Sequence, residues 1–182
     1  MQSLIKKEKK RPLSYEMLET LLPKWCRVTK YDALKNVKSL KDALRVTQML
    51  VVLYNLHDKI THKLVNAPGH FVVINSRAKG QPTEYFSSMG WGPAREIAAT
   101  HSDAKIFDRL LGKDFIHNST QFQRDGDQNT CWRWVWARCI LGHITLAKFQ
   151  QLFRQKVSLA ESDDVITLMT ILSTVQKEYE LQ

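Results

Sequence analysis

Two residues of this chain, Cys131 and His70, have the types and the surroundings that thiol chemistry needs. Cys131 follows a polar, turn-rich run (QFQRDGDQNT) and opens a helix-like segment rich in tryptophan (CWRWVWARC). A cysteine in the first turn of a helix lies at the positive end of the helix dipole, near backbone N–H groups that lack intrahelical partners. Both features favour the thiolate, so the position of Cys131 predicts a nucleophile.

A nucleophilic thiolate needs a base, and His70 is the best-placed histidine to supply it. It opens the apolar run HFVVIN directly after a Pro-Gly turn, where its ring can face a cleft while the apolar residues anchor the backbone. Acyl transfer also needs donors for an oxyanion, and the Cys131 amide together with an upstream glutamine, Gln121 or Gln123, can provide them. These residues together predict a cysteine hydrolase.

A metal site is the rival chemistry for the same part of the chain. Its ligands would be Cys131, Cys139, His117 and His143, but their spacing matches none of the compact Cys-x-x-Cys or His-x-x-x-His pairs of zinc modules. We therefore expect no metal here. Cys139 is expected in the core, and Cys26 is expected to be a buried or half-buried thiol.

The elements that must position these residues indicate an α+β fold, with a small central mixed sheet flanked by helices. Apolar runs predict strands at Met49–Leu56, His70–Asn75 and Glu84–Ser87, with Phe115–Gln123 as a fourth candidate. Caps and periodicity predict helices over 14–23, from about 40, over 93–100, 102–112, 131–141 and 145–155, and from Ser162 onward.

Length, cysteine content and charge limit the class of protein. A chain of 182 residues suits one sizeable core, no apolar run approaches the roughly 18 residues that span a bilayer, and three cysteines suit reduced thiols in an intracellular protein. The net charge is +9, and residues 1–66 hold 14 Lys and Arg against 6 Asp and Glu. This asymmetry suits nucleic acid or a solvated face. We expect a basic flexible arm over 1–12 and a single domain over 13–182.

The order of the motifs resembles the adenain-like and SUMO-specific cysteine proteases, particularly the virion-maturation proteases of adenoviruses, virophages and related large DNA viruses. The likeness rests on HFVVIN, on YFSSMG at Tyr85–Gly90, on NSTQFQ before the cysteine and on TCWRW around it, and it covers about His70 to Leu141. It implies a papain-like fold of the adenain type. It also implies an endopeptidase that cleaves viral capsid precursors during virion maturation, with a ubiquitin-like-modifier isopeptidase as the alternative.

The resemblance implies that Cys131 is the nucleophile, His70 the base and Gln123 the oxyanion donor. The glutamine of the family usually lies slightly closer to the cysteine than Gln123 does, so Gln121 stays an alternative.

The residue that orients the histidine in this family is acidic or an amide, and its position corresponds to Ser87 here. A serine can accept the imidazole N–H but adds no charge, so Glu84 and Asn75 are the alternatives for this role.

Partners and location also follow from the resemblance. The chemistry requires no cofactor, while DNA is a cofactor or a track in the resembling viral proteases and would fit the basic first third of this chain. Substrates would be capsid precursor polypeptides with small residues before the cut, and no membrane is involved. The implied locations are the virion interior and the viral factory in the host cytoplasm. Trp91 and Phe71 are candidate walls of the cleft. A basic nucleic-acid-binding protein without enzymatic activity is the remaining alternative.

Overall fold

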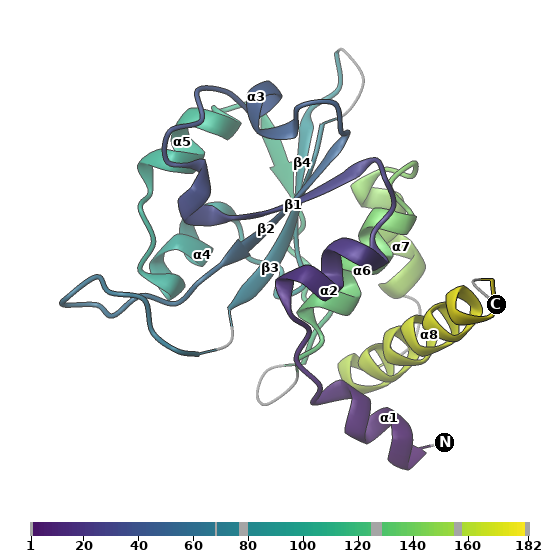
Figure 1. Cartoon of the computed structure of the whole chain (residues 1–182). Helices are drawn as coiled ribbons and strands as arrows, with labels where there is room; N and C mark the ends of the chain where they lie inside the picture. The colour runs from purple at the N-terminus through teal and green to yellow at the C-terminus, as the bar shows by residue number, and fades with distance from the viewer. Residues whose placement is uncertain (1, 68, 77–79, 125–128, 155–157, 181–182) are drawn as a thin grey trace.

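The centre of the fold is a mixed β-sheet (Figure 1), seen in a computed structural model that describes residues 2–67, 69–76, 80–124, 129–154 and 158–180. The five strands of this described part follow one another across the sheet in the order β1-β2-β3-β4-β5. They are β1 (Cys26–Lys30), β2 (Met49–Tyr54), β3 (His70–Asn75), β4 (Thr83–Ser87) and β5 (Phe115–His117). β2, β3 and β4 are antiparallel neighbours, while β1 runs parallel to β2 and β5 parallel to β4.

Strands β2 and β3 form the apolar centre of the sheet. Their register pairs Met49 with Asn75 at one end and Tyr54 with His70 at the other, so His70 lies at the end of its strand. Gly69 enters this strand so close to β2 that a Cβ would lie 2.2 Å from the Tyr54 carbonyl oxygen. Only glycine allows that approach, which places His70 at the margin of the sheet.

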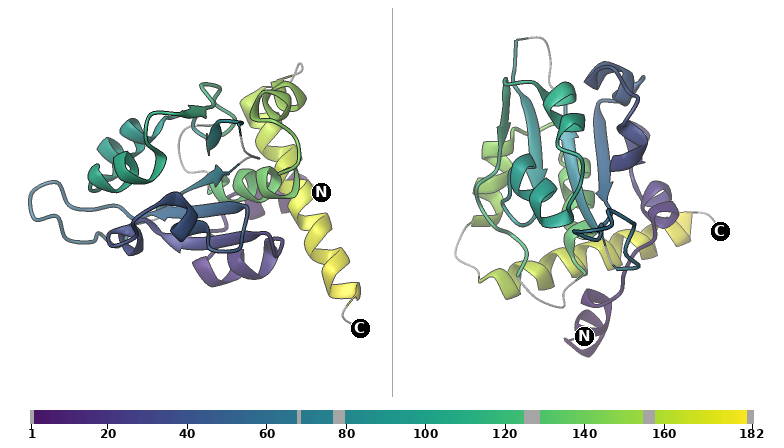
Figure 2. Two further views of the ribbon diagram at one scale, coloured as in Figure 1. Left: turned by 90° about the horizontal axis from the view of Figure 1, so that it is seen from above. Right: turned by 90° about the vertical axis from the view of Figure 1, so that its left-hand side faces the viewer.

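Helices cover both faces of the sheet, and each face has its own core (Figure 2). One core lies under η1 (Tyr31–Leu34), α3 (Leu40–Leu44), α4 (Pro93–Thr100) and α5 (Lys105–Leu111). The other lies under α2 (Tyr15–Leu21), α6 (Cys131–Ile140), α7 (Leu146–Arg154) and α8 (Leu159–Glu180). The predicted α+β fold is thereby confirmed, and α6 brings its tryptophans into the second core, where Trp134 is fully buried.

Residues 2–9 form helix α1 (Gln2–Lys9), in place of the basic flexible arm that the sequence predicts over residues 1–12. Lys9 pairs with Asp164 of α8 at 2.5 Å, and the Glu8 carboxylate lies 3.3 Å from the guanidinium of Arg133 in α6. Helix α1 is thus docked on α6 and α8, because Lys9 and Glu8 form ion pairs with these distant segments.

Two strands also differ from the prediction. β1 is not expected from the sequence, since its stability comes from parallel pairing with β2. The strand predicted over Phe115–Gln123 is limited to β5, and the two glutamines follow it in irregular backbone.

Helix α8 begins before the predicted Ser162. The Ser158 N–H donates to the Glu161 carboxylate at 2.7 Å, and the Glu161 N–H donates to Ser158 Oγ at 3.3 Å. This capping box starts the helix at Leu159 and leaves Ser162 and Asp163 buried within its first turns. Within the part of the chain that the structure describes, no helix is both long enough and apolar enough to cross a membrane.

Candidate active site

His70 is held at the end of β3 by two acceptors. Its Nε2 lies 3.2 Å from Ser87 Oγ on the neighbouring strand β4 and 3.4 Å from Glu96 Oε1 on helix α4. The imidazole side chain is 17% exposed, so one edge of the ring remains accessible. Ser87 and the histidine thus meet across adjacent strands, and the orienting role of Ser87 stays a prediction.

Glu96 supplies the charge that Ser87 lacks, and the sequence analysis missed it. The Ser87 hydroxyl donates to Glu96 Oε1 at 2.5 Å, and both residues are fully buried. Glu96 lies near the start of α4, between the buried Pro93 and Thr100. Its one sequence signal is a glutamate on the inward face of the helix that follows the SSMG turn.

The two alternative orienters lie elsewhere. Glu84 forms a buried ion pair with Arg138 of α6 at 2.6 Å and accepts the Leu146 N–H at 2.7 Å. The Asn75 amide donates to Glu84 at 3.3 Å. Side chains alternate along a strand, so Glu84 and Asn75 face α6 while Ser87 and His70 face the opposite layer. Glu84 ties α6 to the sheet and does not reach the histidine.

Cys131 opens helix α6 and meets the His70 ring. Cys131 is 9% exposed, and its thiol is close enough to the His70 side chain for each group to shift the pKa of the other. The same ring is held through Nε2 by Ser87 and Glu96. The structure therefore brings together the thiol, the imidazole and a carboxylate from α6, β3 and α4.

The electrostatics of this cluster favour charge separation. Burial of the His70 ring favours its neutral form, but the Glu96 carboxylate and the Cys131 sulfur outweigh it and raise the pKa of His70 to about 10. Burial of the sulfur likewise opposes ionisation. The hydrogen bond and charge of His70, aided by the backbone N–H groups of Phe71 and Trp132, nevertheless lower the pKa of Cys131. The arrangement thus stabilises a thiolate beside an imidazolium.

The segment before the nucleophile is fixed by the SSMG turn. The Ser88 carbonyl accepts the N–H groups of Phe122 and Gln123 at 2.8 and 3.0 Å. Gly90 has a φ of +69°, and a Cβ there would lie 2.8 Å from the Thr120 carbonyl carbon. Glycine is needed for this contact, which explains the SxG pattern in physical terms.

The structure separates the two candidate glutamines. The Ser88 hydroxyl donates to Gln123 Oε1 at 2.8 Å, so the amide nitrogen is the end that would donate to an oxyanion. The Gln121 amide instead donates to the Gln123 backbone carbonyl at 2.9 Å. The geometry favours Gln123, and its catalytic role stays a prediction. The predicted RDGDQN turn includes residues 125–128, which lie outside the described residues.

Asp163 of α8 anchors both sides of the nucleophile. Its carboxylate accepts the Thr130 hydroxyl at 2.8 Å, the Trp134 indole N–H at 3.0 Å and the Arg124 N–H at 3.0 Å. Thr130 directly precedes Cys131 and is the N-cap residue of α6. The sulfur position therefore depends on a helix far along the chain.

The remaining candidates have other places. Trp91 lies beside the site, with its ring centroid 6.5 Å from that of His70, whereas Phe71 is buried in the core and forms no cleft wall. Cys139 is fully buried, and burial together with the neighbouring Cys26 raises its pKa. Among the described residues, no three His, Cys, Asp or Glu side chains are placed to hold a metal ion.

Comparison with known proteins finds no family model and no curated protein that matches this chain.

Proposed function

We propose that this protein is a cysteine endopeptidase with Cys131 as nucleophile and His70 as general base and acid. The observation that carries the proposal is the continuous contact from the Cys131 thiol through the His70 ring to Ser87 and Glu96. A thiolate already formed beside an imidazolium can attack a carbonyl without a separate deprotonation step.

The proposed reaction runs in two halves. The Cys131 thiolate attacks the scissile carbonyl, and the Cys131 amide with Gln123 stabilises the oxyanion. The His70 imidazolium protonates the leaving amine, and a thioester remains on Cys131. His70, now neutral, then takes a proton from water, which attacks the thioester. Release of the acid product restores the Cys131 thiolate beside the His70 imidazolium. Glu96 keeps the ring oriented and stabilises its positive charge throughout. No cofactor takes part in this sequence.

The proposed substrates are capsid precursor polypeptides cut during virion maturation, in the virion interior and the viral factory of the host cytoplasm. Support for this choice is the likeness of HFVVIN, YFSSMG and TCWRW to the adenain-like proteases. The mixed sheet with helices on both faces is compatible with the papain-like architecture of the adenain type. A ubiquitin-like-modifier isopeptidase would use the same residues on another substrate.

The deciding experiment incubates the chain with candidate capsid precursors and, separately, with ubiquitin-like conjugates. We expect new fragments from the precursors alone, and none with Cys131→Ala. Cys139→Ala, which removes a buried thiol remote from His70, serves as the matched control and should retain cleavage. Cleavage by Cys131→Ala would refute the proposed nucleophile, and processing of conjugates alone would favour the isopeptidase.

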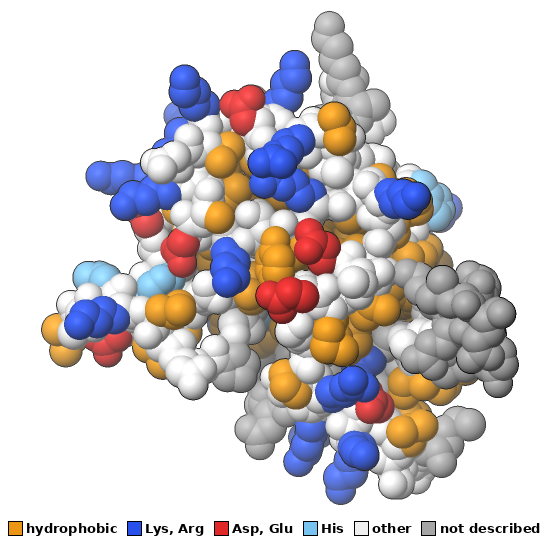
Figure 3. Space-filling view, viewed as in Figure 1, with side chains coloured by type: hydrophobic (Ala, Val, Ile, Leu, Met, Phe, Trp, Pro, Cys, Tyr) orange, Lys and Arg blue, Asp and Glu red, His pale blue; other side chains and the backbone are white. Residues whose placement is uncertain are grey.

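DNA is the proposed partner of the basic first third. Lys and Arg side chains gather over α3 and η1 on the face shown in Figure 3. The exposed members are Lys30, Lys35, Lys38, Lys41 and Arg45. Phosphate neutralisation by such a cluster would hold the enzyme on DNA without reading its sequence.

A further inference from the structure

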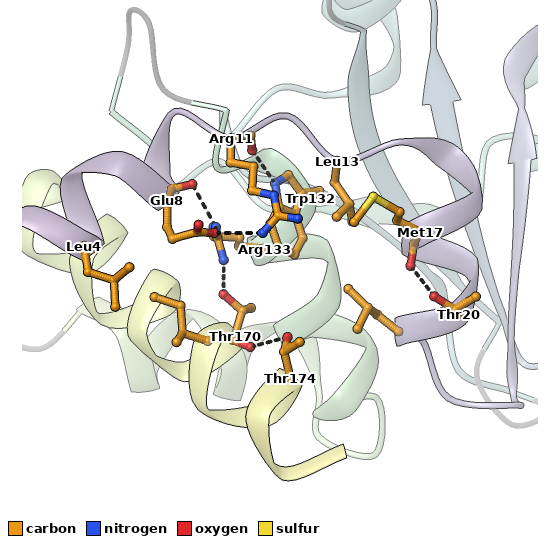
Figure 4. A pocket seen from close by; sticks show the side chains of 12 residues that line it. Leu4, Glu8, Arg11, Leu13, Met17, Thr20, Trp132, Arg133, Thr170 and Thr174 are labelled. Atoms are coloured by element: carbon orange, nitrogen blue, oxygen red, sulfur yellow. Dashed lines mark hydrogen bonds and ion pairs between the residues drawn. The ribbon is translucent and has the colours of Figure 1, made fainter. Parts of the chain in front are cut away.

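Helices α1, α2, α6 and α8 surround a pocket whose lining includes neither His70 nor Cys131 (Figure 4). Its volume is about 260 Å³, slightly below that of typical ligand sites, which suits one apolar group of modest size. The apolar lining comes from Leu4, Leu13, Met17, Leu21, Trp132 and Ile171. Leu4 and Met17 at its rim are 49% and 41% exposed, so the apolar surface continues outside the pocket.

A buried cation, Arg133, forms part of this pocket. Its residue is 1% exposed, and its guanidinium donates to Thr170 Oγ1 and, at 2.8 Å, to the Glu8 carbonyl. Its Nε has no hydrogen-bond partner among the described residues. Burial lowers the pKa of Arg133 to about 10, although Glu8 partly offsets this effect. A desolvated guanidinium with an unused N–H would stabilise, through its charge, an anion bound close by.

The charges that line the pocket do not balance. Arg133 and Arg11 share one carboxylate, that of Glu8, at 3.3 and 3.6 Å. Figure 4 shows the three side chains close together at one side of the apolar space. Two guanidinium groups against one carboxylate leave a positive charge for a ligand to neutralise, and the Arg11 side chain is 55% exposed and reachable from solvent.

We propose that this pocket binds the C-terminus of a partner polypeptide whose last residue is aliphatic. The aliphatic side chain would occupy the space between α2 and Trp132. The terminal carboxylate would accept hydrogen bonds from Arg11 and gain from the charge of Arg133 behind it. A polypeptide fits better than a free acid, because the exposed Leu4 and Met17 extend the apolar surface past what one side chain covers. This site is independent of the proposed proteolysis.

Calorimetric titration of the full chain with two matched peptides tests the proposal. The probe is N-acetyl-Ala-Leu-Leu with a free C-terminal carboxylate, and its control is the same peptide with a C-terminal amide. We expect the acid to bind about tenfold or more tightly than the amide, because only the acid supplies the missing charge. Equal affinities, or no heat of binding for either peptide at about 1 mM, would overturn the proposal.

Three variants assign the binding to this pocket. Arg11→Ala should weaken binding of the acid about tenfold, whereas Lys41→Ala removes an equal charge on α3 and should change nothing. Glu8→Gln should strengthen binding of the acid severalfold and leave the amide unaffected, because it removes the competing carboxylate. Loss of fold cannot produce a gain in affinity. Unchanged binding in Arg11→Ala would show that the peptide binds elsewhere.

Discussion

At the scale of single residues, Glu96 changes the interpretation of the site. Ser87 alone would orient His70 without adding charge. Its hydroxyl, however, donates to the buried carboxylate of Glu96, and an oxygen of that carboxylate also lies 3.4 Å from His70 Nε2. A cysteine and histidine pair with a carboxylate behind it is better suited to hold an imidazolium than a pair without one.

Glu96→Gln should reduce both proteolysis and the reactivity of Cys131 at neutral pH. The substitution keeps the shape and removes the charge that raises the pKa of His70, so less thiolate forms on Cys131. We expect kcat/KM and the rate of Cys131 alkylation by iodoacetamide to fall about tenfold to a hundredfold. Glu19→Gln, an exposed change on α2, is the matched control. Rates equal to the unmodified protein would show that Glu96 does not act on the histidine.

Ionisation of the pair should also give a broad pH profile. Thiolate forms as pH rises through the lowered pKa of Cys131, so activity should rise below the usual thiol value of about 8.5. His70 keeps the proton for the leaving amine until pH approaches its pKa of about 10, and activity should fall above it. The measurement is kcat/KM against pH. An acidic limb at the ordinary thiol pKa would contradict the ion pair.

At the scale of elements, α8 holds the nucleophile in place through Asp163. This carboxylate joins Thr130 before Cys131, Trp134 one turn after it, and the backbone of Arg124. Helix α1 adds contacts on the same side, where the Asn129 N–H donates to the Lys9 carbonyl at 3.0 Å.

Asp163→Ala should both destabilise the fold and lower the rate of Cys131 alkylation. Removing the carboxylate leaves three donors without their acceptor, which we expect to reduce the free energy of unfolding by about 3 kcal/mol. Urea denaturation measures this loss. The neighbouring Asp164→Ala removes a partly exposed ion pair with Lys9 and should cost about 1 kcal/mol or less. If both variants had equal stability and equal alkylation rates, Asp163 would not anchor the nucleophile.

At the scale of the whole molecule, the positive charge is spread over two surfaces with different surroundings. Lys9 of α1 pairs with Asp164 of α8, and its carbonyl accepts the Asn129 N–H beside Cys131, whereas the lysines near α3 face solvent. Removing residues 1–11 would therefore disturb the site as well as the charge.

A cleaner test of DNA binding replaces Lys35, Lys38 and Lys41 by alanine. Each phosphate contact adds about 0.9 to the slope of log affinity against log salt, so the triple variant should lower the slope by up to about 3. Fluorescence anisotropy with duplex DNA across salt concentrations measures it. Replacing Lys59, Lys63 and Lys113, three exposed lysines outside α3 and η1, gives a control of equal charge. If both triple variants had the same slope, the lysines of α3 and η1 would not be the DNA-binding surface.

Local patterns were sufficient to predict much of this fold. The apolar runs of β2 and β3 and the Pro93 start of α4 appear at their predicted places, because turn residues and periodicity act within each segment. β1 and α1 could not be predicted in this way, since β1 depends on pairing with β2 and α1 on ion pairs with α6 and α8.

The same distinction applies to the candidate site. Cys131, His70 and Ser87 have informative neighbours in the sequence, and the structure brings them together. Glu96 carries no such motif, because its role arises only when α4 packs over the end of β3. Asp163 is similar, since a single carboxylate in a long helix gives no sign that it will meet Thr130.

The anchor from α8 has a consequence for the order in which the molecule is made. On the ribosome, Cys131 emerges after His70 and Glu96, but Asp163 follows Thr130 by 33 positions. A nascent chain that ends before α8 already contains Cys131, His70 and Glu96, but it lacks the Asp163 carboxylate that fixes the start of α6. The protein should therefore stay inert during its own translation, and gain its reactivity only when the last helix closes over the tryptophan-rich one.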